Sequence, residues 1–139
     1  MKNGLIIGID PDLDKSGFAV INDGRYVQIC SEFLWDVFDQ LLNFNLGVER
    51  DDMVYIEDGR LTKGTWHKHG QKNVGKNQAI CKLLVEFCKA HSIPYTQLKP
   101  AGYSDMFKNV DVFKAATGWV ERTNEDARAA AAMIFKFKK

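Results

Sequence analysis

The feature that most constrains the fold is an apolar run that ends in an acid. Residues 5–10 read LIIGID, and the acidic stretch PDLD follows at once. An unbroken apolar run of this length is typical of a strand that is buried on both faces of a sheet. The segment is therefore predicted to be a central strand, with Asp10 where the strand leaves the core. The segment VYIE at residues 54–57 repeats the pattern and places Glu57 at the end of a second buried strand.

Turn signals divide the chain into an ordered series of elements. The pair Asp23-Gly24 is typical of a tight hairpin. We predict an α/β fold in a single domain over residues 1–139, with a five-stranded mixed sheet, three antiparallel strands and then two parallel ones, flanked by helices. Strands are expected at 4–10, 18–23, 25–33, 51–58 and 93–99, helices at 35–44, 80–91, 111–118 and 124–137, and a loop at 59–76.

Three carboxylates are predicted to meet at one edge of this sheet. A right-handed crossover places the strand that ends at Glu57 beside the strand that ends at Asp10 and parallel to it, so both acids reach the same edge. In the last helix, Asp126 heads an apolar stripe that turns it toward the sheet: Ala130, Met133, Ile134 and Phe137. Mg²⁺ takes few protein ligands and shares the rest with water and phosphate, so three such acids suit a two-metal phosphodiesterase.

Simpler roles are open for each of these acids. Asp10 could cap a turn, and Glu57 could form a salt bridge at the rim of the sheet. Asp126 could form a capping box with Thr123. The joint occurrence of the three acids, at two strand ends and one helix start, favours the metal site over these separate roles.

Two other sites could explain the alternating aspartates. Asp10, Asp12 and Asp14 match the first ligands of a calcium loop, but Lys15 and Ile21 stand where its glycine and its bidentate glutamate belong. A phosphate-binding hairpin of the actin and sugar-kinase type needs two domains that clamp a nucleotide, which 139 residues do not supply. The strand-end metal site is therefore preferred.

The net charge of +1 conceals an uneven distribution of charge. Residues 1–58 carry a net charge of −8 and residues 59–139 a net charge of +9, and residues 59–85 contain no acid. Basic side chains bind phosphates, and an aromatic ring can stack on an opened base step. We therefore predict nucleic-acid contacts from Arg60, Lys63, Trp66, Lys68, Lys72 and Lys76. A solvated loop without a ligand is the alternative.

The composition is that of an ordinary globular protein, with 45% hydrophobic and 27% charged residues and no apolar run of membrane-spanning length. The N-terminal apolar stretch is too short for a signal peptide and ends in an acid. The three cysteines, Cys30, Cys81 and Cys88, show no metal-binding or redox spacing. Buried free thiols and a cytoplasmic location are expected.

Three segments together resemble the signature blocks of RuvC-like Holliday junction resolvases: IIGIDPDLDKSGFAVI, VYIED and NEDARAAAAMI. The resemblance extends nearly end to end, with NVGKNQAI similar to the start of the family's long helix and KAATGW similar to its basic segment before the last helix. It implies the ribonuclease H-like fold, with Asp10, Glu57 and Asp126 as catalytic residues that bind two Mg²⁺ or Mn²⁺ ions per active site. It also implies a homodimer that acts on branched DNA, the four-way junction of recombination and repair.

Two residues depart from the family's pattern. Asp12 stands where the family usually has glycine, which adds a negative charge near the site. Thr123 stands where many members have a fourth acid or a histidine, which leaves the set of metal ligands either one short or completed by Glu125. Thr123 is suited to cap the last helix instead.

The sequence therefore predicts a metal-dependent endodeoxyribonuclease of the crossover junction type. One alternative is another ribonuclease H-like nuclease, acting on RNA/DNA hybrids or flaps. The other is a nucleic-acid-binding protein that keeps the fold without catalysis, which Thr123 favours because it removes one expected ligand.

Overall fold

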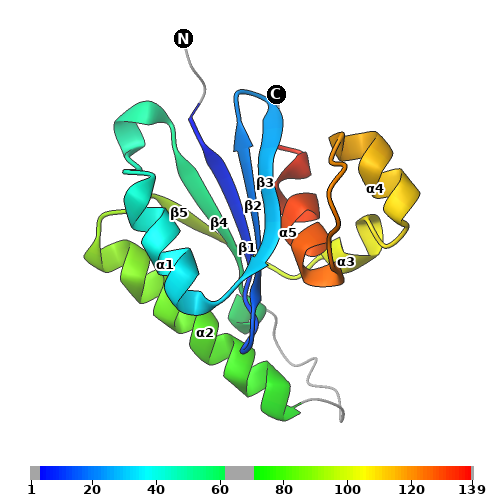
Figure 1. Cartoon of the computed structure of the whole chain (residues 1–139). Helices are drawn as coiled ribbons and strands as arrows, with labels where there is room; N and C mark the ends of the chain where they lie inside the picture. The colour runs from blue at the N-terminus through cyan, green and yellow to red at the C-terminus, as the bar shows by residue number, and fades with distance from the viewer. Residues whose placement is uncertain (1–3, 62–70, 139) are drawn as a thin grey trace.

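The computed structural model describes residues 4–61 and 71–138, without the side chains of residues 71–76. Five strands form one mixed sheet in the order β3-β2-β1-β4-β5 (Figure 1). The strands β1, β2 and β3 pair antiparallel, whereas β4 is parallel to β1 and β5 is parallel to β4. The sheet predicted from the sequence is thereby confirmed. The strand bounds are Ile6–Asp10 for β1, Ser16–Asn22 for β2, Arg25–Glu32 for β3, Met53–Glu57 for β4 and Tyr95–Leu98 for β5.

Helices connect the strands and cover both faces of the sheet. The α-helices are α1 Leu34–Asn43, α2 Gln71–Ala90, α3 Tyr103–Met106, α4 Val110–Thr117 and α5 Glu125–Phe135, and the short 3-10 helices are η1 Val48–Arg50 and η2 Gly59–Leu61. Within residues 4–61 and 71–138, no helix combines the length and the apolar character needed to cross a lipid bilayer.

Two helical features differ from the sequence prediction. The helix α2 begins at Gln71, inside the stretch 59–76 that was expected to be a loop. The apolar spacing that marks a helix starts only at Ile80, so the first turns of α2 carry no such signal. The second difference is the short helix α3, which was not predicted. Its four residues are too few to show a helical periodicity.

Alternation along the strands divides the core into two layers. On β1, Ile7 and Ile9 pack with residues of α1 and α2, whereas Gly8 lies against α5 on the other face. The same alternation on β4 puts its even-numbered residues in the α1 and α2 layer. Because successive strand residues point to opposite faces, Asp10 and Glu57 belong to the α5 face. Figure 1 shows α1 and α2 on one side of the sheet and α3, α4 and α5 on the other.

The backbone of α5 lies unusually close to the middle of the sheet. A Cβ atom built on Gly8 would come within 2.6 Å of the carbonyl oxygen of Ala130, and one built on Gly17 would overlap the carbonyl oxygen of Asp126. Side chains at these two strand positions would therefore push the helix away. Gly17 allows the first turn of α5 to rest directly on β2, and Gly8 allows the next turn to rest on β1.

We expect Gly17→Ala to lower the free energy of unfolding by about 1–3 kcal/mol, the usual range for overpacking. The first turn of α5 has to move to make room for the added methyl group. Urea unfolding followed by circular dichroism measures the change. Gly47→Ala is the matched control, because nothing lies within 4 Å of a Cβ at that position. A Gly17→Ala protein as stable as Gly47→Ala would show that α5 does not pack this closely.

Candidate active site

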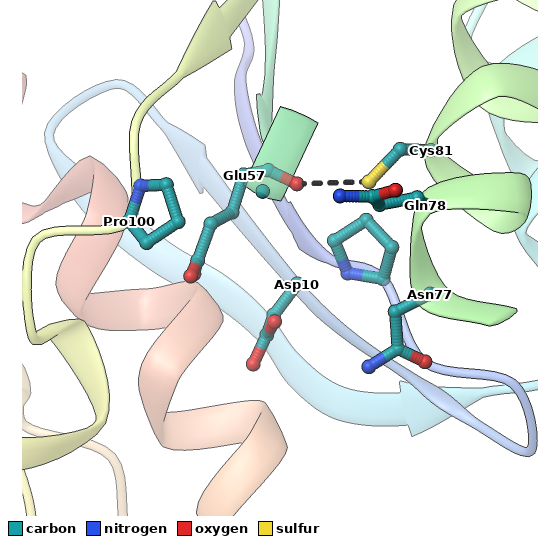
Figure 2. Close-up of a pocket in the computed structure, with 8 residues that line it drawn as sticks. Asp10, Glu57, Asn77, Gln78, Cys81 and Pro100 are labelled. Atoms are coloured by element: carbon teal, nitrogen blue, oxygen red, sulfur yellow. Dashed lines mark hydrogen bonds between the residues drawn. The ribbon is translucent and has the colours of Figure 1, made fainter. Parts of the chain in front are cut away.

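Asp10 and Glu57 lie side by side at the carboxyl edge of the sheet. They are the last residues of β1 and β4. These strands run parallel with Ile9 opposite Ile56, so each acid directly follows a paired residue. Figure 2 shows the Asp10 and Glu57 side chains next to each other. The structure thus brings together the two strand-end acids that the sequence placed at one edge.

Asp126 reaches the same edge from the first turn of α5. Its carbonyl group packs on Gly17, and Gly17 is the residue of β2 that pairs with Asp10. The third predicted acid is therefore next to the strand pair that carries the first. Asp126 is half-buried, as are Asp10 and Glu57.

The three acids share a strongly negative environment. Burial raises the pKa of Asp10 to about 8, with the charges of Glu57, Asp126 and Asp12 as further causes. Burial also raises the pKa of Glu57. The pKa of Asp126 is raised by burial and then by the charges of Asp12 and Glu125. Like charges at close range disfavour each other's ionised form, so after burial the nearby charges of Glu57 and Asp126 also favour a protonated Asp10.

Asp12 is a fourth acid that acts on this cluster. Its backbone N–H donates to Ser16 Oγ at 3.2 Å, which fixes the turn between β1 and β2. The half-buried side chain contributes to the raised pKa of both Asp10 and Asp126. Asp12 therefore adds negative charge beside Asp10 and Asp126.

A cavity of about 250 Å³ opens beside Asp10 and Glu57. Figure 2 shows residues of α2 on the wall opposite these acids. Its lining is completed by Pro11, Gly59, Asn77, Gln78, Cys81 and Pro100. The Cys81 thiol donates to the carbonyl oxygen of Glu57 at 3.2 Å, so α2 is tied to the end of β4. Asn77, Gln78, Cys81 and Pro100 were not predicted to line the site, because they come from elements distant in the chain from both acids.

The start of α5 differs from the prediction that Thr123 caps it. Asn124 is the N-cap, and its Oδ1 accepts from the backbone N–H of Ala127 at 2.9 Å. The hydroxyl of Thr123 instead accepts from Arg128 Nη1 at 3.1 Å. Asn and Thr both suit an N-cap, so the sequence alone could not settle a shift of one residue. Glu125, the expected additional metal ligand, lies exposed in the first turn.

The predicted nucleic-acid contacts are described only in part. Lys63, Trp66 and Lys68 lie outside the described residues, and so do the side chains of Lys72 and Lys76. Arg60 is described, and its guanidinium group binds Asp58, with Nη2 2.7 Å from Oδ2.

Asp58 was missed at the sequence level, although it directly follows Glu57. It is fully buried. Burial alone would raise its pKa, but hydrogen bonds from Arg60 and Gln97 outweigh this effect and lower the pKa. The sequence shows only an acid and an arginine two residues apart after a strand. Many solvent-exposed turns have the same pattern, so it does not predict a buried ion pair.

The donor set fits a hard divalent cation in its chemistry. Asp10, Glu57 and Asp126 all offer carboxylate oxygens, which Mg²⁺ and Mn²⁺ prefer. A cation would also offset their mutual repulsion. In the part of the chain that the structure describes, no three Asp, Glu, His or Cys side chains are arranged to hold a metal ion. The acids would therefore have to rotate toward a common point on metal binding.

Comparison with known proteins gives a structural match only. No family model matches the sequence, and no curated protein matches it. A Thermus thermophilus RuvC in complex with a Holliday junction substrate superposes with a TM-score of 0.65 and 13% identity, over 94% of this chain and 90% of that one. The chain has the ribonuclease H-like fold of RuvC. A second T. thermophilus RuvC structure matches with a TM-score of 0.53 and 14% identity, over 96% of this chain and 95% of that one.

The RuvC fold confirms the fold resemblance that the signature segments indicated. At 13% and 14% identity the likeness establishes the arrangement of the chain and does not by itself establish an activity. The acids at the carboxyl edge of the sheet are therefore the evidence on which a function has to rest.

We expect the metal-free protein to lose stability as the pH rises from about 4 to about 8. The folded state keeps the Asp10 proton up to a pKa of about 8, whereas the ordinary value is 3.8, so the folded state binds more protons in this window. Asp10→Asn should flatten this dependence and should be more stable than the wild type at the upper end by at least about 1 kcal/mol.

Urea unfolding in EDTA over a series of pH values checks this expectation. Asp14→Asn is the control, because Asp14 is an exposed aspartate of the same hairpin. Parallel profiles for the wild type and Asp10→Asn would show that Asp10 is not protonated in the folded state at neutral pH.

Proposed function

We propose that this chain is a structure-selective DNA endonuclease, a Holliday junction resolvase, with Asp10, Glu57 and Asp126 as ligands of two Mg²⁺ or Mn²⁺ ions. The observation that carries the proposal is the meeting of three half-buried acids at one sheet edge, from two adjacent strand ends and a helix start. The RuvC fold supports it, because the chain aligns along most of its length.

The residues of the site supply oxygen ligands and space for a phosphate. Asp126 lies in the first turn of α5, where the positive end of the helix dipole favours a carboxylate. The cavity of about 250 Å³ beside Asp10 and Glu57 has room for a phosphate group and an attacking water. When bound, divalent ions would lower the pKa of that water and offset the charge that develops on the phosphate.

Neutral donors lie opposite the acids. Asn77 and Gln78 of α2 line the same cavity as Asp10 and Glu57 (Figure 2). Amide N–H groups can donate to phosphate oxygens without adding a charge. These two residues are therefore suited to orient a phosphodiester against the acids.

Branched DNA is the proposed substrate. The RuvC structure that matches this chain is a complex with a Holliday junction substrate. We propose that the basic stretch of this chain contacts DNA phosphates, with Trp66 stacking on an opened base step. A homodimer would supply two active sites, one for each of two strands cut in a four-way junction. The proposed contact residues in this stretch are Lys63, Trp66, Lys68, Lys72 and Lys76.

A non-catalytic DNA-binding protein of the same fold is the second candidate. The observation that favours it is Thr123, which offers a hydroxyl engaged by Arg128 where a fourth ligand was expected. Incubation with Mg²⁺ and a panel of four-way junction, flap, duplex and RNA/DNA hybrid substrates distinguishes the candidates. Cleavage restricted to the junction supports the resolvase, cleavage of flaps or hybrids indicates another nuclease, and binding without cleavage indicates the non-catalytic protein.

Asp10→Asn, Glu57→Gln and Asp126→Asn should each lower the single-turnover cleavage rate by roughly 100-fold or more, because each removes a ligand charge from the metal site. The dissociation constant for the junction should change by less than about 3-fold, since contacts to DNA persist. Asp14→Asn should cut at the wild-type rate. A variant that keeps near-normal turnover would show that its residue is not a metal ligand.

The basic stretch can be tested by its salt dependence. Changing Lys63, Lys68 and Lys72 together to Ala should flatten the slope of log Kd against log salt by about 3, one unit for each lost phosphate contact. As a control, changing Lys136 and Lys138 to Ala should leave the slope unaltered, because these residues follow α5 at the end of the helix opposite Asp126. An unchanged slope in the triple variant would mean that the stretch does not contact DNA.

A further inference from the structure

The peptide bond that follows Glu57 is held on both sides. The carbonyl oxygen of Glu57 accepts from the Cys81 thiol at 3.2 Å (Figure 2). The N–H of the same peptide, on Asp58, donates to the carbonyl oxygen of Leu98 at 2.8 Å. The first contact ties the end of β4 to α2, and the second ties it to β5. The two hydrogen bonds fix the backbone from which the Glu57 side chain extends.

The buried Asp58 side chain fixes the turn that comes next. Its Oδ1 accepts from Arg60 Nε at 2.9 Å and from the Arg60 backbone N–H at 2.9 Å. Its Oδ2 accepts from Arg60 Nη2 at 2.7 Å, from Arg60 Nε at 3.1 Å and from Gln97 Nε2 at 2.6 Å. A carboxylate with no exposed surface is stable only with such partners. Both oxygens are thereby occupied, so Asp58 has no free oxygen to offer a metal ion.

Arg60 is neutralised by the same contacts. Its side chain keeps about one-third of its surface exposed, but its guanidinium group is paired with both carboxylate oxygens of the buried Asp58. A cation paired in this way adds little to the attraction of a DNA phosphate, in contrast to a solvated lysine. Arg60 therefore differs in kind from the basic residues with which the sequence grouped it.

The opposite end of β4 provides an internal comparison. Asp52 is also a buried acid, and it accepts from the backbone N–H groups of Leu5 at 2.8 Å and Gly47 at 3.0 Å. Arg50 lies 3.5 Å from it. This pair resembles the Asp58 pair in chemistry, but six residues of extended chain, roughly 20 Å, separate the two acids.

We propose that Asp58, Arg60 and Gln97 form a positioning cluster that holds Glu57 in the orientation required for cleavage, and that Arg60 serves this cluster rather than a DNA phosphate. The inference rests on the proposed nuclease function. It assigns no contact with the substrate to any of the three residues. A displacement of Glu57 by about 1 Å would be enough to slow the reaction by roughly 100-fold.

Arg60→Gln, Asp58→Asn and Gln97→Leu test the cluster, with Arg50→Gln and Asp52→Asn as matched controls. We expect the first two variants to cut a saturating four-way junction about 10- to 100-fold more slowly, and Gln97→Leu to be slowed less. Junction affinity and its salt slope should stay at wild-type values. Arg60→Lys, which keeps the charge and loses the planar fork, should not restore the rate. The controls should lose stability and keep the wild-type rate per folded molecule.

Two results would overturn the proposal. A salt slope flattened by about 1 in Arg60→Gln, with an unchanged cleavage rate, would show that Arg60 is a phosphate contact. Control variants slowed as much as the cluster variants would show a general loss of stability.

The exchange rate of the Asp58 amide hydrogen tests the positioning cluster even if the protein cleaves no substrate. The Asp58 amide should exchange faster in Arg60→Gln and Gln97→Leu, and at the wild-type rate in Arg50→Gln. If the wild type cuts no substrate, the proposed function fails, and this exchange pattern still decides whether the cluster holds the Glu57 peptide. Unchanged exchange in the cluster variants would contradict the positioning role.

Discussion

The close packing of the α5 backbone against β1 and β2 decides where the acids can meet. Gly8 and Gly17 have no side chains, and backbone carbonyls of α5 occupy the space that Cβ atoms would fill. The Tyr26 hydroxyl donates to the backbone of α5 at 2.6 Å and holds the helix against the sheet from β3. Because Gly17 pairs with Asp10, this packing fixes Asp126 beside the end of β1. A larger residue at position 17 would separate the helix from the strands and divide the site.

The same packing concentrates negative charge in a half-buried place. The raised pKa of Asp10, caused first by burial and then by Glu57, Asp126 and Asp12, shows that the metal-free arrangement opposes its own ionised form. Groups held in this way lower stability in exchange for function. A divalent cation would offset the repulsion, so metal binding and folding are expected to be coupled in this protein. The neutral pair of Asp58 and Arg60 beside Glu57 stabilises the strand exit without adding to the charge of the site.

Much of this architecture could be predicted from the sequence, because it depends on local patterns. Apolar runs that end in Asp10 and Glu57, and a helical stripe headed by Asp126, were enough to predict the sheet and the meeting of the acids. The individual side-chain and backbone contacts between these segments could not be predicted. The fit of α5 on Gly17 and the hydrogen bonds from Gln97 to Asp58 depend on packing that no spacing in the chain encodes.

Binding of a divalent metal ion by the three acids can be tested most directly in crystals grown with Mn²⁺ and measured at a wavelength where manganese scatters anomalously. We expect an anomalous peak at the carboxyl edge of the sheet, about 2.2 Å from carboxylate oxygens of Asp10 and at least one of Glu57 and Asp126. A fully occupied Mn²⁺ site elsewhere on the protein, with no peak at this edge and the three acids still apart, would contradict it.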